Sequence, residues 1–272
     1  MLFGKERQRV AQAIRDLVVR PRMDNQVTDG DLGAGLQVLV RLAAAPLTFL
    51  PQTAARLPLT LREIGERRRA IPPARRLVPN PALALGAVTG SLTSDDVLRT
   101  RYLNLLAAAM DRATSAQVHP GFLAVLRQMT SDETRIFSRF ESDGPYPLIS
   151  IQSHPKHGGT RRTELRHFSL LGEEAGCEHP QRAPMYLDNL CRLGLTEIRP
   201  TRLSEDTRMF KPLESHADVT SLMARIANRP PVTDAQNGND PLVADVQYKY
   251  LFVTSFGRQF YDACEYRPEA DI

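Results

Sequence analysis

An apolar stripe runs through "DDVLRTRYLNLLAAAMD", residues 95–111. Its large apolar side chains recur at steps of four, three, one and three residues, which is the spacing of one face of a helix. They are Leu98, Tyr102, Leu105, Leu106 and Ala109. A helix with one such face has to bury it against other helices, so this stretch predicts the central helix of a helical domain.

Polar residues mark the start of this helix. Thr93 or Ser94 can cap its N-terminus, and Asp95 and Asp96 then lie in the first turn. Carboxylates are favourable there because the N-terminal end of a helix carries a partial positive charge.

Further helices, separated by prolines, are expected on both sides. Upstream they cover residues 2–19, residues 32–45 and a stretch after Pro58. The segment "IPPARRLVPNPAL", residues 71–83, carries four prolines and predicts an extended connector. Downstream, "HPGFLAVLRQM" and "TSDETRIFSRF" predict two short helices, the second opened by a capping box of Thr130 and Glu133.

Composition changes at "ESDGPYPLIS", residues 141–150, where a turn with Gly and Pro precedes a β-like run. We therefore expect an all-helical domain over residues 1–141 and a smaller α+β domain over residues 142–272. The strands are expected at residues 148–152, 195–199 and 246–253.

The second domain has the element order of a winged helix. Four elements follow one another: a short helix in "PMYLDNLCRLGL", the strand "LTEIR", a return strand, and a terminal helix capped by Thr254 or Ser255. Residues 203–242 form an insertion with one helix near residues 218–227 and the polar loop "PPVTDAQNGNDP". The predicted fold class is mainly α, an N-terminal helical domain followed by a winged-helix-like α+β domain.

The composition is that of a globular protein. Of 272 residues, 42% are hydrophobic and 24% are charged, and the formal net charge is +4, which allows a nucleic-acid or anionic-membrane partner without requiring one. Cys177, Cys191 and Cys264 are widely spaced and form no CxxC pair, which predicts free thiols. With no signal peptide at the N-terminus, we expect a cytoplasmic protein.

The most apolar stretch is "LGAGLQVLVRLAAAPLTFL", residues 32–50. Gln37, Arg41 and Pro46 interrupt it, whereas a spanning helix needs about 20 mostly apolar residues. We predict a core helix here. Peripheral contact with a membrane surface is the alternative, because basic residues at 67–69 follow.

Asn104, Asp111 and His119 are residue types that catalytic sites use, but each has a structural explanation. Pro120 suits the first turn of a helix, with His119 at or beside its N-cap. Asp111 can bond to turn amides or to Arg112, and Asn104 can satisfy backbone groups across a helix contact. No hydrolase, P-loop, dinucleotide-binding or zinc-enzyme motif is present. We therefore predict no enzyme, no catalytic residue and no cofactor.

Histidine and cysteine gather weakly in one region. His154 and His157 are spaced as HxxH, with His167, Cys177 and His179 further on. This arrangement lacks the paired spacing of a structural zinc site. We expect a solvated loop, with metal binding as the less favoured alternative.

Three blocks of sequence carry a family resemblance. They are residues 71–140, "YLDNLCRLGLTEIR" and "VTSFGRQFYDAC". In this order they resemble the Abi-alpha family of bacterial proteins, named for abortive infection. That family has a segment like "LLAAAMD", a His-Pro-x-Phe turn, a "DNLxRLGL" block and a "TPFGxxFxxAC" block; Ser255 stands where proline is usual. The matching residues have the character of helix-end and packing residues, and they are Asn104, Asp111, His119, Pro120, Phe122, Asn189, Gly194 and Gly257.

The resemblance implies a two-part bacterial protein linked to phage defence, or to toxin and immunity gene neighbourhoods, and no established reaction. Our first hypothesis is a non-enzymatic interaction protein of phage defence whose partner is another protein. The alternative is an immunity protein that occludes a cognate toxin. A third hypothesis is a winged-helix DNA-binding protein, for which the basic residues are Arg182, Arg192, Arg199 and Arg202. It ranks last because the short helix spends most of its positions on packing and carries Asp188.

Overall fold

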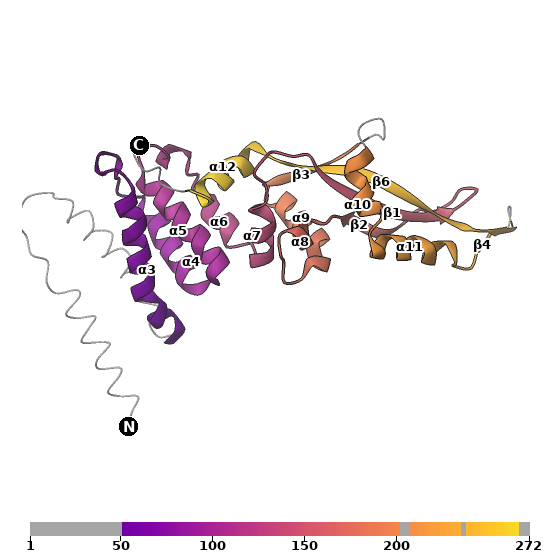
Figure 1. Cartoon of the computed structure of the whole chain (residues 1–272), viewed down its shortest axis with the longest axis horizontal. Helices are drawn as coiled ribbons and strands as arrows, with labels where there is room; N and C mark the ends of the chain where they lie inside the picture. Colours follow the sequence, from indigo (N-terminus) through magenta and orange to yellow (C-terminus); the bar gives the residue numbers. More distant parts are fainter. Residues whose placement is uncertain (1–50, 202–206, 235–237, 267–272) are drawn as a thin grey trace, which may run out of the picture. The chain divides into compact units, whose positions relative to one another are not determined.

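The computed structural model describes residues 51–201, 207–234 and 238–266 (Figure 1). All of the described residues belong to one compact unit. The helices predicted at residues 2–19 and 32–45, and the apolar stretch 32–50, lie outside the described residues. No helix among the described residues is long and apolar enough to cross a membrane.

The first part of the described chain is helical. Its elements are α3 (Pro51–Ala70), η2 (Pro73–Arg75), α4 (Pro81–Thr93), α5 (Asp96–Met110), η3 (Ser115–Gln117), α6 (Phe122–Leu126) and α7 (Ser131–Phe137). Helix α5 is the central helix, as predicted, because it packs against α3, α4, α6 and α7. The N-cap of α5 is Asp95, whose side chain accepts hydrogen bonds from the amides of Val97 and Leu98, so the cap lies one residue beyond the predicted Ser94.

Helix α4 was not predicted, and the proline-rich connector is correspondingly shorter than residues 71–83. Its sequence, "PALALGAVTGSLT", is apolar on every side, so it has no amphipathic period to detect. Asn80 caps it, and Pro81 stands in its first turn, where a missing amide hydrogen costs nothing. Gly90 lets α5 approach, since a Cβ there would lie 2.4 Å from the Tyr102 ring.

The other helix boundaries differ in small ways from the prediction. Helix α3 begins at Pro51 and contains Pro58, an exposed position, whereas we expected it to start after Pro58. The capping box of Thr130 and Glu133 on α7 is confirmed. Helix α6 begins at Phe122, so its cap is not His119 as predicted.

The second part is built on a four-stranded antiparallel sheet of order β2-β1-β6-β3. The strands are β1 (Tyr146–Pro155), β2 (Arg162–Phe168), β3 (Thr196–Pro200) and β6 (Leu242–Val253), with a separate hairpin of β4 (Val232–Asp234) and β5 (Gly238–Asp240). The helices are α8 (Leu171–Glu174), η4 (Pro180–Arg182), α9 (Ala183–Arg192), η5 (Thr207–Phe210), α10 (Lys211–Glu214), α11 (Ala217–Ala227) and α12 (Ser255–Cys264).

Three features of this part differ from the prediction. Strand β2 was not predicted, because "RTELRHF" is too charged to be recognised as a strand without its partner β1. Strand β1 extends to Pro155, so His154 lies on a strand and not in the expected loop. The polar loop of the insertion contains the β4–β5 hairpin. The insertion helix is confirmed as α11, and Thr254 is confirmed as the N-cap of α12.

Helices pack on both faces of the sheet, because successive side chains of a strand point to opposite faces. Ile149, Ile151 and Tyr250 form a core with Phe210 and with residues of α10 and α11. Helix α9 contacts β2 and β3, and His167 of β2 bonds to Asp188 of α9. The predicted order of helix, strand, return strand and helix is present in α9, β3, β6 and α12, but β3 and β6 belong to a larger sheet.

The terminal helix α12 packs against α5 of the helical part (Figure 1). The chain therefore returns to its helical part after the sheet. The predicted boundary between residues 141 and 142 stays a prediction.

Candidate functional site

Asp111 is fully buried and ends the central helix. Its carboxylate accepts two hydrogen bonds from Arg75, at 2.9 and 2.5 Å, one from the Tyr266 hydroxyl at 2.5 Å and one from the Ala113 amide at 2.9 Å. Burial by itself would raise the pKa of Asp111, but the hydrogen bonds from Arg75 and Tyr266 outweigh it and lower that pKa. The predicted turn bond is confirmed, whereas the charged partner is Arg75 and not Arg112.

Asn104 joins two helices, as its position on the edge of the apolar stripe suggested. Its side-chain amide donates to the carbonyl of Cys264 at the end of α12, at 2.8 Å. Its oxygen accepts from Nε of Arg67 at 3.2 Å. Asn104 therefore fixes α12 and α3 on α5.

His119, Pro120 and Phe122 shape the turn into α6. Nδ1 of His119 accepts from the amide of Gly121 at 3.0 Å, which caps the turn instead of the helix. The ring of Phe122 lies 5.8 Å from that of His119, 5.3 Å from that of Phe256 and 5.4 Å from that of Phe260. The His-Pro-x-Phe turn thus packs on the residues of α12 that follow Thr254.

Asn189 connects α9 with the helical part. Its side-chain nitrogen donates to the carbonyl of Gln128 at 3.0 Å and to Glu133 at 2.8 Å. Arg192 donates to the Asn189 oxygen and to the Gln128 side chain, so this arginine is held against its own chain.

Two glycines are required where α9, β3 and α12 meet. Gly194 has a φ of +75°, a conformation that L side chains rarely adopt. A Cβ on Gly257 would lie 2.0 Å from the carbonyl oxygen of Leu195. The polar motif residues therefore bond to neighbouring segments, and the two glycines allow a positive φ and a close backbone approach.

An open groove of about 690 Å³ lies beside these motif residues. Its walls come from two segments, residues 77–83 and residues 115–127, with Ala109 of α5 between them. Three lining residues are polar or charged, namely Asn80, Ser115 and Arg127. The others are apolar, and they are Leu77, Val78, Pro79, Ala82, Leu83, Ala109, Val118, Pro120, Leu123 and Ala124. A groove of this volume is within the range of ligand-binding clefts.

Val78 and Arg127 are an exposed aliphatic side chain and an exposed cation of the groove. Val78 is 53% exposed, which is high for a large aliphatic side chain. Arg127 is exposed, and its side chain makes no hydrogen bond or ion pair with the residues that the structure describes. Together they offer an apolar contact and a positive charge in one groove. Sequence reasoning did not find this site, because the connector and the turn come together only in the tertiary structure.

The arginines considered for DNA binding that lie among the described residues have different surroundings. Arg192 is bonded to Asn189 and Gln128, while Arg199 is paired with Glu197 and lies 5.1 Å from the centre of the Phe252 ring. Arg182 precedes α9, and Arg202 lies outside the described residues.

The histidines considered for metal binding have separate partners. Nδ1 of His157 bonds to Asp240 and Nδ1 of His167 to Asp188, while Nδ1 of His154 lies 2.8 Å from the carbonyl of Pro155. Within residues 51–201, 207–234 and 238–266, no three His, Cys, Asp or Glu residues are grouped to hold a metal ion. The three cysteines are free thiols, and burial raises the pKa of Cys177 to about 11.

A protein-family model described as "Abortive infection alpha" matches residues 52–264 of the chain. A search of curated proteins found no match. One solved structure, an uncharacterized protein from the hydrocarbon-degrading marine bacterium Alcanivorax borkumensis SK2, is similar at 19% identity and a TM-score of 0.33, over 57% of this chain and 96% of the other.

Proposed function

Because this chain belongs to the Abortive infection alpha family, we propose that it acts in abortive infection as a non-enzymatic protein that binds a partner protein. The proposal places the partner in the groove between residues 77–83 and residues 115–127. The observation that carries the proposal is an exposed aliphatic side chain, Val78, in a mostly apolar groove. The one cation that lines this groove, Arg127, has no ion pair among the described residues.

The chemistry of the groove defines the segment that fits it. An apolar side chain of the partner would cover Val78 and displace water from the groove. An acidic residue of the partner would pair with Arg127, since a guanidinium binds a carboxylate with charge-assisted hydrogen bonds. The predicted occupant is therefore a protein segment with an apolar residue and a nearby Asp or Glu.

The location of the groove supports a role in this family. Both of its walls lie within the residues that the family model matches, and Pro120 of the His-Pro-x-Phe turn is part of the lining. The motif contacts of Asp111 and His119 hold the connector and the turn in position. In this proposal the motif residues act by shaping a binding surface.

A paired substitution tests the proposal in cells. Val78→Asp puts a charge on the groove and is expected to abolish protection in a phage challenge measured by plaque counts. Met185→Asp is the matched control, because Met185 is 56% exposed, belongs to α9 and does not line the groove. Equal protection by the Val78→Asp and native proteins, at equal folded amounts, would contradict the proposal.

A site-specific crosslink separates the forms of the hypothesis. A photoreactive amino acid at position 78 is expected to capture one protein during phage challenge, and the same group at position 185 is not. A captured toxin encoded beside this gene would identify an immunity protein, and a captured phage or defence component would support the first hypothesis. Loss of the crosslink on Arg127→Glu would confirm that the partner lies in the groove.

A further inference from the structure

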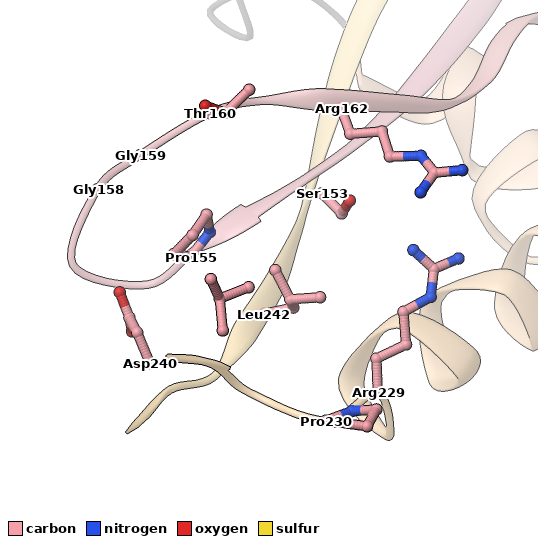
Figure 2. Close-up of a pocket in the computed structure, with 11 residues that line it drawn as sticks. Ser153, Pro155, Gly158, Gly159, Thr160, Arg162, Arg229, Pro230, Asp240 and Leu242 are labelled. Carbon is pink, nitrogen blue, oxygen red and sulfur yellow. The ribbon is translucent and has the colours of Figure 1, made fainter. Parts of the chain in front are cut away.

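A second cavity, of about 650 Å³, lies at one end of the sheet, far along the chain from the groove (Figure 2). The turn between β1 and β2, the residues that follow α11, and the start of β6 surround it. Its lining residues are Ser153, Pro155, Gly158, Gly159, Thr160, Arg162, Arg229, Pro230, Val232, Asp240 and Leu242.

One wall of this cavity carries a surplus positive charge. Figure 2 shows the guanidinium groups of Arg162 and Arg229 facing one another on the same side. Glu164 accepts two hydrogen bonds from Arg229, at 2.5 and 3.0 Å, and lies 3.8 Å from Nε of Arg162. The hydrogen bond from Arg229 lowers the pKa of Glu164 to about 2, so Glu164 is ionised and cancels only one of the two positive charges.

The acidic residue of the cavity, Asp240, already has hydrogen-bond partners within the protein. Asp240 is buried, and its carboxylate accepts hydrogen bonds from the backbone amide of His157 at 3.0 Å and from its ring at 2.9 Å. This pair fastens the turn between β1 and β2 to β5. Asp240 therefore holds the turn in place, and Figure 2 shows it on the opposite side of the cavity from the guanidinium groups of Arg162 and Arg229.

The remaining surface is apolar and leaves room for a side chain. Pro155, Pro230, Val232 and Leu242 supply aliphatic surface to the lining. Gly158 and Gly159 have φ values of +113° and +138° and put no side chain into the space. A cavity with one apolar surface and one cationic wall favours a ligand that carries both kinds of group.

We propose that this cavity binds a carboxylate attached to a short aliphatic group, as at the C-terminus of a peptide that ends in valine or leucine. Arg162 would receive the carboxylate, because its side chain is 77% exposed and its ion pair with Glu164 is long, at 3.8 Å. A single negative charge matches the one positive charge that Glu164 leaves uncompensated on the arginine wall, whereas a phosphate dianion would exceed it. The aliphatic side chain would lie on Leu242 and its neighbours.

Fluorescence anisotropy with a labelled hexapeptide that ends in Leu-Val tests the inference on the full chain. Binding is expected with a Kd of about 1 mM or tighter, and the same peptide with an amidated C-terminus is expected to bind at least about tenfold more weakly. N-acetylvaline, titrated by calorimetry, distinguishes the source: an affinity equal to that of the peptide assigns a small free acid, and a weaker one assigns a peptide end.

Three variants locate the binding. Arg162→Ala is expected to weaken it about tenfold, since it removes a charged donor without uncovering a buried group. Val232→Trp should block the cavity, and its 44% exposure lets the fold accept the larger ring. Arg166→Ala is the control, because Arg166 lies on the same strand, pairs with Asp188 and does not line the cavity.

The outcomes separate this site from the groove. The inference is supported if Arg162→Ala and Val232→Trp weaken peptide binding while Arg166→Ala and Val78→Asp leave it unchanged. Absence of binding for both the peptide and N-acetylvaline, or equal affinity of the free and amidated peptides, overturns it. Neither result depends on phage protection, so the proposed function can fail while this site stands.

Discussion

Replacing Asp111 with alanine tests whether the motif aspartate is structural. The sequence by itself suggests the loss of an ordinary turn bond, on the order of 1 kcal/mol. The structure requires a larger loss, because Asp111 is fully buried and accepts bonds from Arg75, Tyr266 and Ala113.

The magnitude follows from what the substitution removes. Breaking a buried ion pair by deleting one partner costs about 3–5 kcal/mol. The Arg75 side chain is 29% exposed, so water can replace part of its lost bonding. We therefore expect a loss of about 3 kcal/mol in the free energy of unfolding for Asp111→Ala, the lower end of that range. His119→Ala should cost about 1 kcal/mol, because His119 is exposed and accepts one turn bond.

Urea denaturation followed by far-UV circular dichroism measures both values, with phage protection normalised to the amount of folded protein. Tyr266→Phe is a useful comparison, since it removes one donor to Asp111 and should cost about 1 kcal/mol. A loss under about 1 kcal/mol for Asp111→Ala would refute the reasoning from buried contacts. Complete loss of protection in a normally stable Asp111 variant would show that this residue does chemistry.

Gly257→Ala should destabilise the protein, because the new Cβ would lie 2.0 Å from the carbonyl oxygen of Leu195. Gly65→Ala on α3 should instead stabilise it, because nothing lies within 4 Å of the new Cβ and alanine favours a helix more than glycine does. Melting temperatures measure both effects. Folding lowers the pKa of Glu164 from 4.5 to about 2, so as the pH falls the unfolded chain takes up the proton first. The ionised Glu164 therefore contributes fully to the free energy of unfolding above about pH 4.5, and this contribution is lost as the pH falls towards 2. Acid titration of Glu164→Gln should show a shallower decline over that window. Affinity for random DNA should stay micromolar or weaker and be unchanged in Arg192→Ala; tight binding with a steep salt dependence would favour the DNA-binding hypothesis.

Local patterns predicted the elements that have a clear period or a capping sequence. The apolar stripe of α5 needs no partner to be recognised, because helical spacing is visible in the residues themselves. The capping box of Thr130 and Glu133, and the Thr254 cap of α12, depend on side chains within three residues of the helix start. These elements were correctly predicted for that reason.

Elements defined by their neighbours were missed. Helix α4 contacts α3, α5 and α6, and its exposed face carries Leu85 where an amphipathic helix would have a charged residue, which removes the amphipathic signal. Strand β2 is charged, and its backbone bonds to β1 are what make it a strand. Neither condition can be read from a short window of sequence.

The sequence by itself determined most helices of the described first part, strands β1, β3 and β6, the Thr254 cap, and the family to which the motif blocks belong. It also predicted a bond across a helix contact for Asn104 and a turn bond for Asp111, and the family resemblance placed Asn189 among the packing residues. Only the tertiary structure decided which groups they meet, and it alone formed the groove of Val78 and Arg127 and the cavity of Arg162. Both hollows join segments that are distant along the chain, and such contacts depend on how helices and strands pack, which no local pattern encodes.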